Sequence, residues 1–109
     1  MDAGALLRLI SEPTRHAMLE RLRSGPCDVG QLVAAVGSEQ SNVSHHLSLL
    51  RDAGVVGAQR AGRRRVYHIA DQELTRLMAE VDALAARLEQ VAYSAALGLP
   101  AQPAYTGYG

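Results

Sequence analysis

The first part of the chain places apolar residues at the spacing of short amphipathic helices. One helix is predicted over about residues 3–10, and Ser11-Glu12-Pro13 interrupts it. Glu12 is the expected N-cap of a second helix, because Pro13 then takes the first helical position, where its missing N–H leaves no bond unmade. The second helix is predicted to end near Arg23, just before Ser24-Gly25-Pro26.

Two further helices follow with almost no loop between them. A third helix is predicted over about residues 29–36, with Gly37 as its C-terminal cap and Ser38 as the N-cap of a fourth. Such a short connection between consecutive helices is typical of a helix-turn-helix.

The fourth helix has one apolar and one polar face. Val43, Leu47 and Leu50 recur at steps of four and three and are expected to face the core. The opposite face is polar and carries Gln40, Ser41, Asn42, Ser44, His45, Ser48 and Arg51. His46 lies next to Leu47, so we expect it to make a structural or phosphate contact rather than to read a base.

Beyond the fourth helix the pattern changes to that of a β-hairpin. Its strands are rich in Val, Tyr and Ile and are joined by a short turn near Ala61-Gly62. Arg60, Arg63, Arg64 and Arg65 lie within six residues around this turn. Because four neighbouring cations repel one another, the hairpin is expected to meet an anion. The alternative is a hairpin whose charges only keep it in solution and protect its edges.

A long helix is predicted from Asp71, its expected N-cap, to about Leu97. Its apolar positions alternate steps of three and four, the spacing of helices that pack along their length. A single small domain has little surface to cover so long a stripe, so we interpret it as a dimer interface. The proposed dimer contacts are Leu77, Val81, Leu84, Leu88 and Val91, joined by Leu6 and Leu9 of the first helix.

The size and composition fit one small, mostly helical domain. The 109 residues contain 48% hydrophobic side chains and four aromatics, all Tyr. We expect one domain over residues 1–97 and a disordered tail over residues 98–109. No apolar run suggests a membrane span and no signal peptide is evident, so a cytoplasmic location is expected. The single cysteine, Cys27, cannot form an internal disulfide or a zinc finger.

The formal net charge is zero, but its distribution is uneven. Residues 1–70 carry nine Arg and six acidic residues, a net charge of +3, whereas residues 71–109 carry two Arg and five acidic residues, a net charge of −3. All the basic residues are Arg, which favours planar contacts with phosphates and guanine edges. The local positive charge therefore favours a nucleic-acid partner despite the neutral total.

The order of four helices, a hairpin and a last helix resembles the ArsR/SmtB family of winged helix-turn-helix regulators. The residues that carry the resemblance are Glu12-Pro13-Thr14-Arg15, the run from Gln40 to Val56, and the wing segment from Arg60 to Tyr67. The resemblance implies a mostly α fold with one small β-hairpin. It also implies a homodimer that binds operator DNA, usually as a repressor, and responds to a metal ion or another chemical signal.

The polar face of the fourth helix and the wing are the predicted DNA contacts. Gln and Asn pair bidentately with adenine, and Ser and His donate to bases or phosphates. A recognition helix enters the major groove with its N-terminus first, so its first residues should reach deepest. The alternative for any single polar residue is a solvated surface. The predicted contacts to double-stranded operator DNA are Gln40, Ser41, Asn42, Ser44, His45 and Arg51 from the helix, and Arg63, Arg64 and Arg65 from the wing.

The metal sites of the family are largely missing here. One family site is a thiolate pair at the start of the third helix, but Asp28 and Gly30 occupy those positions and Cys27 lies one residue outside them. The other lies in the last helix. There Asp71 matches the first ligand, but the next three positions hold Glu73, Leu84 and Arg87. Leu and Arg cannot bind a metal, so no metal site is predicted from the family motif.

Other signals to which the protein could respond stay open. His16, His68, Asp71 and Glu73, with Cys27, form a weaker donor set for nickel or zinc, although their spacing does not require one. For Asp71 the helix cap is the stronger interpretation, and for Cys27 a buried structural residue is favoured over a redox sensor. A separate protein could instead supply the signal.

Two other classes of function are alternatives to DNA binding. An enzyme is not predicted, because Ser44, His45 and His46 point in different directions on a helix and no oxyanion loop accompanies them. A protein-docking or dimerisation module without DNA binding is the distant alternative, supported only by the long last helix.

Overall fold

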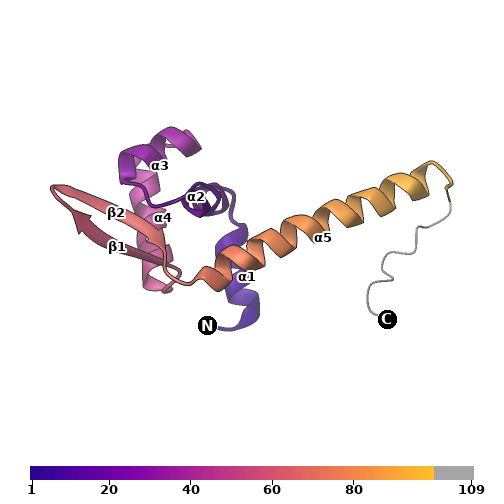
Figure 1. Ribbon diagram of the computed structural model, residues 1–109, viewed down its shortest axis with the longest axis horizontal. Helices are drawn as coiled ribbons and strands as arrows, with labels where there is room; N and C mark the ends of the chain where they lie inside the picture. The colour runs from indigo at the N-terminus through magenta and orange to yellow at the C-terminus, as the bar shows by residue number, and fades with distance from the viewer. Residues whose placement is uncertain (100–109) are drawn as a thin grey trace. The chain divides into compact units, whose positions relative to one another are not determined.

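The computed structural model describes residues 1–99, so all but the first two residues of the predicted tail lie outside the described part of the chain. The elements are α1 (Ala3–Ser11), α2 (Pro13–Arg23), α3 (Val29–Val36), α4 (Gln40–Asp52), β1 (Val56–Ala61), β2 (Arg64–Ile69) and α5 (Gln72–Ala96) (Figure 1). This is the predicted order of a mostly α fold with one β-hairpin, and that prediction is confirmed.

The chain forms two compact units, Met1–Thr75 and the part that begins at Arg76. The first unit holds α1 to α4, the hairpin and the start of α5, and the second is the remainder of α5. Among residues 1–99, no helix combines the length and the apolar composition that crossing a membrane requires.

The core of the first unit lies between α2, α3, α4 and the base of the hairpin. Its fully buried side chains are Met18, Leu19, Cys27, Leu32, Val43 and Leu50. Burying one such Leu, Val or Met side chain stabilises the folded state by about 1.5–3 kcal/mol. The core therefore holds α4 by the three residues predicted to face inward, since Leu47 is also buried.

Local caps mark the helix boundaries. The Glu12 carboxylate accepts a hydrogen bond from the Arg15 N–H, so the predicted cap of α2 is confirmed. Gly37 ends α3 with φ 67°, a left-handed conformation that favours glycine, also as predicted. Asp71 caps the start of α5, because its Oδ1 accepts from the Glu73 N–H at 2.9 Å.

The predicted N-cap of α4 is wrong. Glu39, not Ser38, holds the N-cap position, and its side chain makes no capping hydrogen bond. The Ser38 hydroxyl is used elsewhere, because its Oγ accepts a hydrogen bond from Asn42 Nδ2 at 2.7 Å. Ser38, one residue before the N-cap, therefore accepts a hydrogen bond from a side chain of the first helical turn instead of from a backbone N–H.

The hairpin is a regular antiparallel pair in the register from Val56↔Ile69 to Ala61↔Arg64. Its turn contains Gly62, whose φ of 65° suits the tight connection between the strands. The α2–α3 linker runs along the outer edge of β2, since Cys27 and Tyr67 exchange two backbone hydrogen bonds of 3.1 and 2.8 Å. No local pattern in the sequence predicts this third segment beside the hairpin.

Candidate nucleic-acid interface

The polar face of α4 is exposed along its whole length. Val43, Leu47 and Leu50 are buried on the inner face. The outer face carries the residues predicted to contact DNA, and each of them is exposed: Gln40, Ser41, Asn42, Ser44, His45 and Arg51. Because the inner face is fixed in the core, the outer face is a rigid surface, as a helix that must fit a groove requires.

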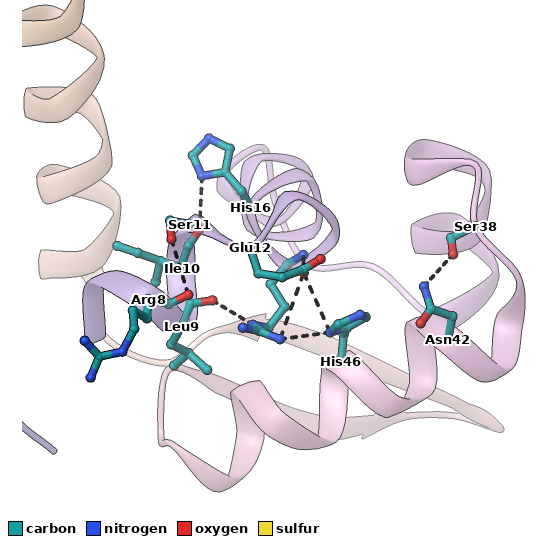
Figure 2. Close-up of polar contacts among 10 residues, drawn as sticks. Arg8, Leu9, Ile10, Ser11, Glu12, His16, Ser38, Asn42 and His46 are labelled. Carbon is teal, nitrogen blue, oxygen red and sulfur yellow. Dashed lines mark hydrogen bonds and ion pairs between the residues drawn. The ribbon is translucent and has the colours of Figure 1, made fainter. Parts of the chain in front are cut away.

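Two of these polar residues have part of their hydrogen-bonding capacity used within the chain. Asn42 donates one N–H to Ser38, a contact that Figure 2 shows at the start of α4. A carboxamide has a second N–H and an oxygen on its other edge, which is the pair that adenine recognition needs. Ser48, further along, donates to the Ser44 carbonyl at 3.1 Å, so its hydroxyl proton is directed back to its own helix.

His46 is a structural residue that joins α4 to the junction of α1 and α2 (Figure 2). Arg15 Nη1 lies 3.1 Å from His46 Nδ1, and Arg15 Nε donates to the Leu9 carbonyl at 2.7 Å. Since a guanidinium can only donate, His46 Nδ1 is the acceptor in this contact. Of the two alternatives predicted for His46, the structure shows the structural contact.

The Glu12 carboxylate completes this cluster. Its Oε2 lies 3.8 Å from His46 Nδ1 and 3.9 Å from Arg15 Nη1. Desolvation acts to raise the pKa of Glu12, but hydrogen bonds from the Arg15 and Thr14 backbone and the nearby Arg15 charge lower it below its ordinary value. The cap of α2 is thus also an electrostatic partner of the residues that support the recognition helix.

The wing gathers positive charge at its tip. A hollow of about 280 Å³ is lined by Ala58, Gln59, Arg60, Arg63, Arg64 and Arg65. Arg65 lies over the Tyr67 ring, with its guanidinium carbon 6.0 Å from the ring centre. Within residues 1–99, neither Arg60 nor Arg63 has an ion-pair partner, so both charges are available to an external anion.

Arg64 differs from its neighbours because it is held by the start of α3. Its Nη2 and Nε lie 2.7 and 3.0 Å from Asp28 Oδ2, and Nη2 also donates to Gln31 Oε1 at 3.1 Å. The Gln31 backbone N–H and the Arg64 side chain lower the pKa of Asp28. Asp28 was not predicted as a partner of the wing, although the Asp-x-x-Gln spacing could have identified it as a helix cap.

The apolar stripe on α5 is uncovered in the single chain. Val81, Leu84 and Val91 are each 47% exposed, and Leu88 is 58% exposed. Leu77 is half-buried, as are Leu6 and Leu9 in the first unit. Four large apolar residues on one side of a helix form a surface that a partner would have to cover.

The residues predicted as a weaker donor set for nickel or zinc lie in separate local environments. His16 Nδ1 lies 3.2 Å from the Ile10 carbonyl oxygen and its Nε2 lies 3.8 Å from Glu20. His68 packs against Gly57 across the hairpin, where a Cβ atom would come within 2.8 Å of the ring. Asp71 caps α5 and Glu73 is exposed in its first turn. Within residues 1–99, no three His, Cys, Asp or Glu side chains come together as metal ligands.

Cys27 is buried, as predicted, with 1% of its surface exposed. Burial raises the pKa of its thiol, and Asp28 acts in the same direction, although Arg21 opposes the shift. The thiol is therefore neutral and shielded, which is the state of a structural cysteine.

A helix with a buried inner face and a polar outer face, next to an arginine-rich hairpin, defines a winged helix-turn-helix DNA-binding protein. Residues 12–57 match the family model described as "Bacterial regulatory protein, arsR family". The chain belongs to this ArsR family, whose members are DNA-binding transcriptional regulators and not enzymes.

Two mycobacterial relatives illustrate the similarity. The chain is 44% identical to the transcriptional regulator CmtR of Mycobacterium tuberculosis over 84 residues, which cover 74% of this chain and 71% of CmtR. It is 43% identical to the regulator NmtR of the same species over 79 residues, which cover 72% of this chain and 66% of NmtR. About a third of each relative thus lies outside the match.

Solved structures share the fold. The crystal structure of Rv0081 from M. tuberculosis matches with a TM-score of 0.76 and 35% identity over 80% of this chain and 88% of that one. The cadmium metal-sensor CMTR from M. tuberculosis matches with a TM-score of 0.63 and 44% identity over 71% and 80%. The homodimeric winged helix-turn-helix DNA-binding domain of Mb0332 from Mycobacterium bovis matches with a TM-score of 0.70 and 28% identity over 83% and 91%.

Proposed function

We propose that this chain is a homodimeric repressor that binds a palindromic operator in the bacterial cytoplasm. The observation that carries the proposal is the exposed polar face of α4, held rigid by a buried inner face and adjoining the arginines of the wing. Repression is favoured over activation because the relatives include a named transcriptional repressor, SmtB.

The proposed contacts divide between bases and backbone. Asn42 and its neighbours Gln40 and Ser41 read base edges in the major groove, because they lie at the first turn of α4. Ser44 and His45 contact bases or adjacent phosphates, and Arg51 contacts the backbone. In the wing, Arg63 and Arg65 contact phosphates or the minor groove. Arg64 differs from these two residues because Asp28 already neutralises its charge.

The exposed stripe of α5 supports the dimer. Packing against a second copy would remove from water four exposed apolar side chains of α5 and the half-buried Leu77. The four exposed residues are Val81, Leu84, Leu88 and Val91. Leu6 and Leu9 of α1 are proposed to join the same contact. A symmetric dimer then presents two recognition helices to half-sites about 10 base pairs, or a multiple of that, apart.

Selection of binding sites from a random DNA pool tests the proposal. The purified chain should enrich one imperfect palindrome, with the two halves separated by about one helical turn. The variant Asn42→Ala changes an exposed side chain and should lose base preference at one position in each half-site. If no sequence is enriched even at low salt, a dimerisation module without DNA binding becomes the better interpretation.

A metal response is the second candidate, because a similar solved structure is named a cadmium metal-sensor. Within residues 1–99 the candidate donor residues do not gather into a ligand set. Native mass spectrometry after incubation with nickel, zinc, cobalt and copper decides the question. One ion bound per protomer would support a sensor with nickel or zinc as effector, and no bound ion would favour a signal supplied by a separate protein.

A further inference from the structure

Beyond its buried base, the wing contacts the α2–α3 linker at two points along the outer edge of β2. One is the pair of backbone hydrogen bonds between Cys27 and Tyr67. The other is the salt bridge between Asp28 and Arg64, called here the Asp28–Arg64 bridge, with N–O distances of 2.7 and 3.0 Å. The two attachments are consecutive in the α2–α3 linker but three residues apart on the strand, so together they define the direction of the wing.

The acceptor of this bridge is itself held in place. Asp28 Oδ1 accepts the Gln31 N–H at 2.8 Å, and Gln31 Oε1 accepts the Asp28 N–H at 2.9 Å, which together form a capping box. Arg64 then joins both side chains. A carboxylate already fixed by its own helix loses little further freedom when it binds a cation, so this network is stronger than an isolated surface pair.

The charge of Arg64 also differs from that of the other wing arginines. Arg60 and Arg63 have no ion-pair partner within residues 1–99, whereas Arg64 faces a carboxylate whose pKa is lowered and which is therefore ionised at neutral pH. An arginine that contacts a phosphate releases a counterion from DNA, and this release sets the salt dependence of binding. An arginine that keeps its own carboxylate adds little to that release.

We infer that Arg64 positions the wing through the Asp28–Arg64 bridge and stays bound to Asp28 when the protein is on DNA, while Arg63 and Arg65 contact the phosphates. This inference rests on the proposed DNA binding and changes one part of the sequence prediction, which counted Arg64 among the phosphate contacts.

The salt dependence of operator binding separates the two roles. The variant Arg63→Ala should make the slope of log K against log salt shallower by about 1.8 per dimer, because two phosphate contacts are lost. Arg64→Ala removes the same charge one residue away. We expect it to leave the slope unchanged and to weaken binding by roughly three- to tenfold, because the wing is less well oriented. A slope as shallow as that of Arg63→Ala, or an unchanged affinity, would overturn the inference.

The partner variant Asp28→Asn gives a second test. Asparagine is as good an N-cap as aspartate, so α3 should keep its start, which thermal unfolding checks. Removing the carboxylate frees Arg64 to meet a phosphate, so the slope should steepen by up to about 1.8 per dimer. In the double variant Asp28→Asn/Arg64→Ala the slope should return to the wild-type value. A steeper slope that persists in the double variant would mean that Arg64 is not responsible, which contradicts the bridge.

The arginine Nε–H signals in an NMR spectrum of the whole chain observe the bridge directly. In the free protein, Asp28→Asn should shift the Arg64 signal and leave that of Arg63 in place. On addition of operator DNA, the Arg63 signal should move while that of Arg64 stays. If the wild-type protein bound no DNA, the proposed function would fail, yet the free-protein spectrum would still decide whether Asp28 holds Arg64.

Discussion

The substitution Leu84→Asp tests the dimer at the middle of the α5 stripe. Leu84 is 47% exposed in the single chain, so about half of its side-chain surface remains for a partner to bury. Burying that half contributes on the order of 1 kcal/mol, and a symmetric interface contains the residue twice. Placing a carboxylate there removes this gain and adds a desolvation cost of several kcal/mol for each ion.

The combined loss of roughly 4 kcal/mol or more should weaken the dimer by about a thousandfold. Sedimentation velocity at micromolar concentration should therefore show dimers for the wild type and monomers for Leu84→Asp. The control is Ala86→Asp, which adds the same charge two residues away at an exposed position outside the stripe and should remain dimeric. A Leu84→Asp variant that still sediments as a dimer would mean that the interface lies elsewhere.

Three further predictions concern α4 and the core. Asn42→Ala should lose about 1–3 kcal/mol of discrimination at one base pair per half-site, measured by competition with operator variants; equal losses on all sequences would mean a backbone contact. Leu50→Ala should lower the free energy of unfolding by about 2–5 kcal/mol in denaturant titrations, because Leu50 is fully buried. Cys27, whose pKa is raised by burial, should stay a neutral thiol at pH 7 to 8 and react with a disulfide reagent only when the protein unfolds; fast labelling of folded protein would contradict its burial.

The elements themselves were accessible to sequence reasoning because their signals are local. The two faces of α4 follow from the steps between Val43, Leu47 and Leu50, and the start of α2 follows from Glu12-Pro13. The cap of α4 was not accessible in the same way. Ser38 and Glu39 are both near the helix start, and the choice between them depends on Asn42, which takes the Ser38 hydroxyl as its acceptor.

Contacts between distant segments account for what the sequence did not reveal about the candidate site. His46 gives no sign of its partner, since Arg15 lies 31 residues earlier and reaches it only because α2 packs on α4. The candidate metal ligands are the opposite case, because the fold does not bring these residues together. His16, His68, Asp71 and Glu73 are suitable donor types, but the fold gives His16 a backbone carbonyl, His68 a glycine neighbour and Asp71 a helix cap.

The spacing of residues within single elements was enough to predict the order of the elements, the polar surface of α4, the arginine-rich wing and the apolar stripe of α5. The differences among the four wing arginines arise from the folded arrangement of distant segments. Arg60, Arg63, Arg64 and Arg65 carry the same charge in the sequence, but Arg64 alone reaches Asp28, which lies 36 residues earlier. Because the capped start of α3 lies beside the edge of β2, Arg64 makes a structural contact with Asp28.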